Sequence, residues 1–421
     1  MNAAQVFSGR RRLTQGELDM MIEAHERLCA GRPGGKRLSL HFVDMSGLNL
    51  SGRNLNDADF TGSSFDGARM VGTKLERATL FGCDLRKADL RQAVLTRADM
   101  RGACLKGANL TNANLKQADF RVGQISIPHP RKGLDSMRHE TRNGEMDHAI
   151  LTGASLDGAH LAEASAYATD FSDCSLRGAI LTSANLKEAN LTGAILEGAD
   201  VGGANLEGAN LEGAVLTGVD MGRARTTGAN MAGCLTHPSH AALMRAPLLA
   251  QIAKSHHAWV ATGAKSGQAG KLDGEDLRAL GDALKGMRLT AISAKGACMV
   301  GMDFTAAHLQ GANLEDADLR GAVLKGCDLR GARMARANLT KADLRGAQIG
   351  ALPLGPSRST PASLAGCRLR YAQAQAADFS DANLDNTDMN GADFTGALLI
   401  GATLRGADLS SVTGLDLGVD I

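Results

Sequence analysis

Histidines are the residues of this sequence best suited to metal binding or acid–base chemistry. They gather in two segments, with His129, His139 and His148 in the first and His237, His240, His256 and His257 in the second. Imidazole is a common zinc ligand, and three or four convergent donors would make a site. Their spacings match no standard site, and no suitably spaced cysteines or carboxylates join them. The simpler interpretation is that they are surface histidines, with a metal-dependent activity as the alternative.

Motifs of the well-known enzyme classes are missing from the sequence. It contains no nucleophile elbow, Walker phosphate loop, dinucleotide fingerprint or zincin motif. The glycines, 51 of the 421 residues, recur at a regular spacing instead of forming one phosphate-binding cluster. We therefore predict a protein that is not an enzyme and has no catalytic residue, no cofactor and no bound metal.

Charge is balanced over the whole chain but not within each part of it. Lys and Arg number 46 against 45 Asp and Glu, so no global field favours nucleic acid or an anionic membrane. Residues 149–234 hold 4 basic and 10 acidic side chains. Within this segment, Asp200, Glu207 and Glu212 are the candidate partner-facing residues.

A repeat of five residues defines the elements that must position these side chains. In GANLEGANLEGAVL, residues 203–216, a small residue stands two positions before each large apolar one, as Ala204 precedes Leu206. The pattern recurs over the ranges Leu50–Phe120, Leu151–Met231, Met299–Ile349 and Leu364–Leu409. A period of five fits neither an α-helix nor an ordinary strand. It favours a short extended segment followed by a corner, where glycines such as Gly208 supply permissive backbone.

The repeated phrase A(D/N)LxG, seen as ADLRG at Ala317–Gly321 and ANLEG at Ala204–Gly208, resembles that of the pentapeptide repeat family. The resemblance implies an all-β solenoid, a right-handed quadrilateral β-helix with four pentapeptides in each coil of twenty residues. Large residues twenty apart, such as Leu176, Leu196 and Leu216, would then stack in columns. Charged residues twenty apart would likewise be neighbours, so on this geometry we expect Lys187 to pair with Glu207. The resemblance also permits a specific activity, because some family members imitate duplex DNA and protect gyrase from quinolones.

Breaks in the repeat divide the chain into eight segments. We predict a helical cap at 1–37, pentapeptide tracts at 38–125, 149–234, 291–349 and 362–421, an inserted loop at 126–148, a helical insertion or linker and possible second cap at 235–290, and a proline-rich loop at 350–361. Thr14 and Glu17 have the spacing of a capping box at the start of the first helix. His25 and His257 precede similar Gly-Lys pairs, which suggests that a capped unit is duplicated.

Two further patterns concern the segment 235–290 and the cysteines. Apolar residues in 235–290 have helical spacing in two patches, Leu248–Ile252–Trp259 and Leu277–Leu280–Leu284. Of the eight cysteines, five occupy the small position of the repeat, namely Cys83, Cys174, Cys234, Cys327 and Cys367. No CxxC pair is present, so we expect buried, reduced, structural thiols.

The function that these observations favour is protein binding. We predict a bacterial-type, soluble, cytoplasmic protein whose rigid rod of coils presents faces and inserted loops to an unidentified protein partner. No apolar stretch is long enough to span a membrane, and no aromatic-lined basic groove for nucleic acid is evident. The alternatives are a DNA-mimicking modulator of gyrase and a metal-binding activity at the histidines. The near-neutral charge and the basic residues of 38–125 count against DNA mimicry.

Overall fold

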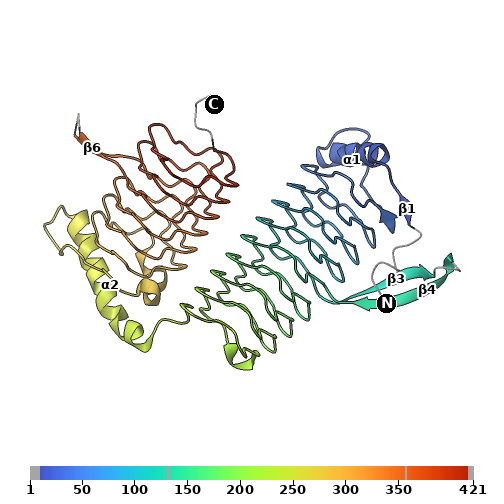
Figure 1. The fold of residues 1–421 in the computed structure, drawn as a ribbon. Helices are drawn as coiled ribbons and strands as arrows, with labels where there is room; N and C mark the ends of the chain where they lie inside the picture. The colour runs from blue at the N-terminus through green and yellow to red at the C-terminus, as the bar shows by residue number, and fades with distance from the viewer. Residues whose placement is uncertain (1–9, 130–132, 356–357, 416–421) are drawn as a thin grey trace. The chain divides into compact units, whose positions relative to one another are not determined.

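The computed structural model describes residues 10–129, 133–355 and 358–415, where short parallel bridges between successive coils replace extended β-sheets. Asn49 bridges Arg69, and the same twenty-residue step joins Asn54 to Lys74. Because successive bridges start five residues apart, each coil has four faces (Figure 1). The chain divides into two compact units, Met1–His237 and Pro238–Ile421, and coils of this kind build both.

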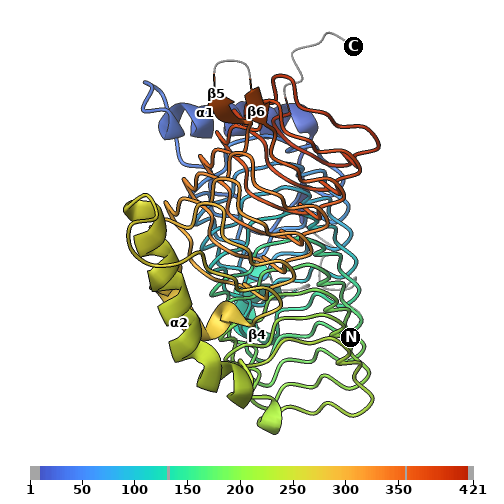
Figure 2. The same ribbon diagram turned by 90° about the vertical axis from the view of Figure 1, so that its left-hand side faces the viewer.

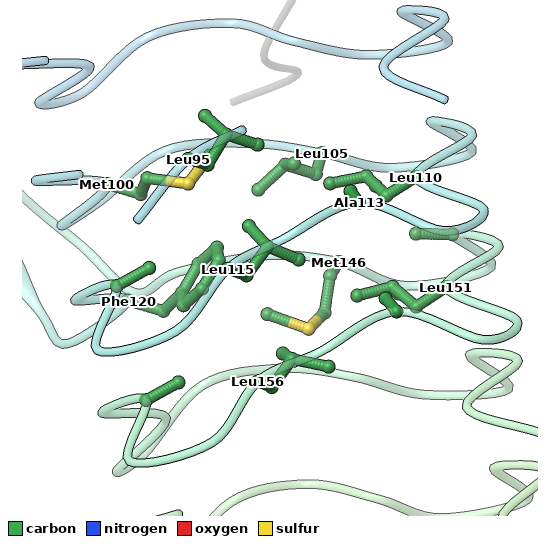
Figure 3. Packing of buried hydrophobic residues seen from close by; sticks show 14 of the residues in the cluster. Leu95, Met100, Leu105, Leu110, Ala113, Leu115, Phe120, Met146, Leu151 and Leu156 are labelled. Carbon is green, nitrogen blue, oxygen red and sulfur yellow. The ribbon is translucent and has the colours of Figure 1, made fainter. Parts of the chain in front are cut away.

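The core of each unit is a set of columns of large and small apolar side chains. Leu176, Leu196 and Leu216 are all buried, as the twenty-residue period predicts. Figure 3 shows the columns in the first unit, where leucines of one coil lie beside those of the next. Each fully buried leucine contributes roughly 1.5–3 kcal/mol, so many small terms take the place of one aromatic core.

Corners between faces depend on left-handed backbone and on short polar side chains. Gly208 and Gly213 have φ of 67° and 66°. Asn205 accepts a hydrogen bond from the backbone N–H of Glu207 at 3.1 Å, which fixes the turn locally. Arg97 adopts φ of 58° at an equivalent corner, so the coil imposes this conformation even where glycine is missing.

A helix covers the first coil of the first unit. β1 (Arg11–Arg12) pairs in parallel with β2 (Val43–Asp44), and α1 (Gln15–Cys29) follows with Thr14 and Glu17 forming a capping box. Leu18, Ile22 and His25 are buried, whereas Leu28 and Cys29 are exposed. A solenoid needs such a cap because its end coil exposes apolar side chains and unpaired backbone.

A second helix begins the second unit. α2 (His240–Ala261) starts at the N-cap Ser239 and lies beside the coils of its own unit (Figure 1, Figure 2). Its buried residues are Ala242, Leu249, Ala253 and His256. The predicted apolar stripe at Leu248 is therefore wrong by one position, because Leu248 faces outward and Leu249 packs into the core.

The apolar patch around Leu280 lies in a 3-10 segment and not in an α-helix. η3 (Leu277–Leu284) is interrupted at Gly281, whose φ of 52° ends one turn and begins the next. A shorter 3-10 turn, η2 (Met221–Arg223), lies in the last coil of the first unit. The η3 segment is part of a coil. Lys271 and Asp276, which precede it, form bridges with Ser293 and Cys298 of the following coil.

Both predicted loops are β-hairpins. β3 (Gly123–His129) pairs antiparallel with β4 (Gly133–Arg142), so the first hairpin begins three residues before the predicted loop 126–148, and β5 (Leu352–Gly355) pairs with β6 (Arg358–Thr360) inside 350–361. The prolines and charges favour an irregular backbone, but the two strands of each hairpin form backbone hydrogen bonds with each other. The coils resume earlier than expected, because Cys104 bridges Glu145 and Leu105 then packs beside Met146 (Figure 3).

Cysteines in the small position form hydrogen bonds as well as filling space. The thiol of Cys83 donates to the carbonyl of Phe60 at 3.0 Å, and that of Cys327 donates to Phe304 at 2.8 Å. Thr73 makes the same bond to Leu50 at 2.8 Å. All eight cysteines are free thiols. Only four of them are buried, contrary to the expectation, because Cys29 is exposed and Cys104, Cys234 and Cys298 are partly exposed.

Candidate functional site

The three candidate acidic residues lie on the outside of the first unit. Asp200 and Glu212 are exposed and Glu207 is partly exposed. Glu207 and Glu212 follow successive corner asparagines, so they lie on neighbouring faces of one coil. Asp200 accepts a hydrogen bond from the backbone N–H of Gly202 at 2.9 Å. The coil thus spreads the three carboxylates over successive faces and does not bring them into one cluster.

The expected pair between Lys187 and Glu207 does not form. Both residues are described by the structure, and their side chains make no ion pair with each other. A neighbouring set of contacts between successive coils does form. The side chain of Arg177 binds Glu197 at 3.2 Å, and the backbone N–H of Arg177 donates to the carboxylate of Asp157 at 3.2 Å. The twenty-residue period places side chains side by side, but side-chain conformation decides which of them pair.

Several basic residues of the first tract form ion pairs with carboxylates, often only two residues away. The guanidinium of Arg91 binds Asp89 with two hydrogen bonds, at 2.8 and 2.7 Å, and Arg101 binds Asp99 in the same way. Arg77 reaches Asp57 of the previous coil at 2.7 Å. This Asp-x-Arg pair was not predicted, although the sequence shows it as DLR and DMR at successive turns. These ion pairs neutralise part of the positive charge of the tract.

The histidines do not converge on a metal site in the described part of the chain. Within it, no group of three or more His, Cys, Asp or Glu side chains could hold a metal ion. His148 is exposed and packs edge-on against Tyr167, with ring centroids 5.4 Å apart. The side chain of His129 lies outside the described residues. His240 is exposed, whereas His256 is fully buried.

His256, and not His257, is the structural counterpart of His25. Both imidazoles are buried, on the helix that begins each unit. The Nδ1 atom accepts a backbone N–H, from Leu38 to His25 at 3.1 Å and from Gly270 to His256 at 2.9 Å. The equal spacing from His25 to Gly31 and from His257 to Gly263 aligned the wrong histidine, because His256 lies one residue further from the end of its helix than His25 does.

The base of the first hairpin covers an outer face of the first unit. Ile125 is buried, and a Cβ added to Gly82 would overlap it. Burial lowers the pKa of Arg10 to about 10, partly offset by Asp84, and burial raises the pKa of Cys104 to about 12. These residues make the hairpin base a packed part of the unit and not a free recognition loop.

The N-terminal half of α2 carries an exposed apolar surface. Leu243, Met244 and Leu248 are 52%, 70% and 51% exposed. Pro247 lies among them and is also exposed. The side chains that hold α2 to its unit point the other way, so these three contact no core cluster. We refer to Leu243, Met244 and Leu248 as the α2 patch.

None of the helices in the described ranges combines the length and the apolar character needed to cross a membrane.

The sequence matches the family model for pentapeptide repeats in eight copies. They lie at residues 44–80, 74–112, 146–178, 169–208, 194–233, 288–326, 317–349 and 377–413, which together make up more than half of the chain. A search of curated proteins finds no match.

Several solved structures are similar to parts of the chain. QnrB1, a plasmid-mediated fluoroquinolone resistance protein, is 19% identical over 50% of this chain and 97% of its own, with a TM-score of 0.29. HetL, involved in heterocyst differentiation regulation in Nostoc sp. strain PCC 7120, is 20% identical over 92% of this chain and 93% of its own, with a TM-score of 0.15. Rfr23 from Cyanothece 51142 is 33% identical over 31% of this chain and 88% of its own, with a TM-score of 0.21.

Proposed function

The chain belongs to the pentapeptide repeat family, and we propose that it is a non-enzymatic scaffold that binds a protein partner through side chains on the outside of its units. The α2 patch is the observation that carries this proposal. Exposed apolar side chains that gather in one place are typical of protein interaction sites, because their transfer out of water drives association. The methionine adds a flexible side chain that adapts to a partner surface.

The carboxylates of Asp200, Glu207 and Glu212 would serve as a separate contact in the same scaffold. None of the three forms an ion pair with another described residue, so each can accept a cation from a partner. Charges of this kind chiefly affect the association rate and its salt dependence. They are therefore secondary to the α2 patch.

Affinity capture with the full chain tests the proposal. The α2 variant carries Leu243→Ser, Met244→Ser and Leu248→Ser, and a matched control carries Met20→Ser, Leu354→Ser and Ile400→Ser, which replaces equally exposed but scattered side chains. We expect a partner identified by mass spectrometry to be recovered at least about tenfold less with the α2 variant, a loss of about 1.4 kcal/mol, and unchanged with the control.

A charge variant, with Asp200→Asn, Glu207→Gln and Glu212→Gln, forms a third arm of the same experiment. It should weaken capture only at low salt. Equal recovery of the partner by the α2 variant and the control would contradict the role of the α2 patch.

A further inference from the structure

Each unit begins with the same arrangement of a buried histidine between a helix and the first coil. His25 lies on α1 and His256 lies on α2, and both are buried. Besides the bond accepted at Nδ1, the Nε2 atom lies 3.0 Å from a backbone carbonyl, that of Asn56 for His25 and that of Thr290 for His256. One imidazole therefore joins the helix to the start and to the end of the first coil.

These two bonds require a neutral imidazole with its proton on Nε2. A carbonyl can only accept, so Nε2 must donate, and a backbone N–H can only donate, so Nδ1 must accept. A second proton would place an N–H at Nδ1 directly against the N–H of Leu38 or Gly270. That bond would be lost, and a charge would remain in a buried position.

The charged groups around each ring do not reverse this preference. Near His25, the carboxylate of Glu26 binds Arg53 at 3.0 Å and that of Asp57 binds Arg77 at 2.7 Å. Arg37 adds a repulsive charge, and the thiol of Cys29 lies 3.6 Å from Nε2. Burial lowers the pKa of His25 below its ordinary value of 6.5, despite the hydrogen bond to Asn56 and the carboxylates of Asp57 and Glu26.

Among the described residues, no carboxylate near His256 shifts the pKa of its imidazole. Burial lowers the pKa of His256, the Thr290 and Leu289 backbone opposes this, and the neighbouring His257 lowers it further. The ring of Trp259 lies 5.6 Å away and contributes no charge. His257 uses its own Nδ1 to accept the backbone N–H of Arg288 at 3.0 Å.

We propose that His25 and His256 are matching pH-sensitive latches, which hold α1 and α2 on their first coils at neutral pH and release them in acid. The direction of the pH effect follows from the linkage between proton binding by the histidine and docking of the helix. A histidine whose pKa is lowered by folding stabilises the docked helix fully above its unfolded pKa of 6.5, and this contribution is lost as the pH falls from 6.5 towards the lowered value. Release uncovers the backbone edge of the first coil, which is then open to pairing with another chain.

Hydrogen exchange of the full chain at pH 7.5 and pH 5.0, corrected for intrinsic exchange rates, measures the release. The ratio of undocked to docked helix should rise between these pH values for each latch, by at most about 30-fold, which is the limit set by titration of the undocked imidazole. Amides of α1 and α2 should lose protection accordingly. Amides of the central coils around Leu196, which lie far in sequence from either latch, should not change.

Two single variants serve as controls for each other. Glutamine can still donate to the carbonyl but does not titrate, so His25→Gln should abolish the pH response of α1 and leave that of α2, and His256→Gln should do the reverse. His240→Gln, at an exposed position on α2, should change neither. Trp259 is the only tryptophan of the chain, and its fluorescence follows α2 independently.

Two outcomes would overturn the proposal. One is equal protection of both helices at pH 7.5 and 5.0 in the unaltered protein. The other is a pH response of α2 that persists in His256→Gln. If that variant fails to fold its unit, the unaltered protein and His25→Gln still decide the question for α1.

Discussion

Single residues of this protein are specified by their place in the five-residue period. The position of the large side chain is buried in most coils, with exceptions near the ends of the units such as Met231 and Leu404, and the bridge position one residue earlier is usually at least partly exposed. Leu384 and Leu398 illustrate the difference, because the first is fully buried and the second is 51% exposed. The small position is equally specific, since Cys83 and Thr73 there donate a hydrogen bond to a carbonyl of the preceding coil.

These two leucines give a stability prediction. Leu384→Ala removes side-chain contacts inside the column and should cost about 2–5 kcal/mol, since a stacked coil cannot fully collapse around the cavity. Leu398→Ala is the matched control and should change stability by about 0.5 kcal/mol or less. Urea denaturation followed by the fluorescence of Trp259 measures both in the second unit. Similar costs for the two variants would show that the column does not hold the unit together.

At the scale of elements, insertions are packed onto the coils and do not simply extend from them. The first hairpin enters between Phe120 and Glu145 without disturbing the phase, because Phe120 still pairs with His160 and Cys104 with Glu145. At the base of the hairpin, the side chain of Ile125 packs over Gly82. Deleting all of 126–148 would therefore remove part of a coil, and would not test a recognition loop alone.

The hairpin base should contribute measurably to the stability of the first unit. Ile125→Ala is expected to cost about 2–4 kcal/mol, because the side chain is buried against the outer face of the coils. Ile150→Ala, at a position 42% exposed in the same unit, should cost about 1 kcal/mol or less. Hydrogen exchange at residues 80–105 and chemical denaturation report the difference. Unchanged protection in Ile125→Ala would mean that the hairpin base is dispensable.

At the scale of the whole molecule, the chain consists of two units that each have a cap, a set of coils and a core. The first core contains Leu18 and Ile22 of α1, and the second contains Leu249 and Ala253 of α2. Backbone pairing in a solenoid links each coil only to its neighbours, so stability is the sum of local terms. Each unit therefore contains the interactions that it needs to fold.

We expect residues 1–237 and 238–421 to fold as separate fragments. Circular dichroism and hydrogen exchange of each fragment should match those of the same residues in the full chain, and Trp259 should keep its emission spectrum in the second. A fragment that is unfolded alone but folded in the full chain would contradict this expectation.

The amino-acid sequence by itself determined the five-residue period, the inward small and large positions and the corner glycines, and the four faces and the columns twenty apart followed from the resemblance to the pentapeptide repeat family. The period is a relation between residues five apart, so the information is local and repeated many times. The capping box of Thr14 and Glu17 was predictable for the same reason, because both partners lie within one turn.

Only the tertiary structure decided the features that occur once. Whether Glu207 pairs with Lys187, whether Leu248 or Leu249 enters the core, and which histidine contacts the first coil depend on the side-chain conformations and the docking of a helix. The two hairpins also escaped prediction, because their strands are stabilised by pairing with each other and not by an apolar period. Such contacts join residues without a fixed spacing, so no periodic pattern in the sequence records them.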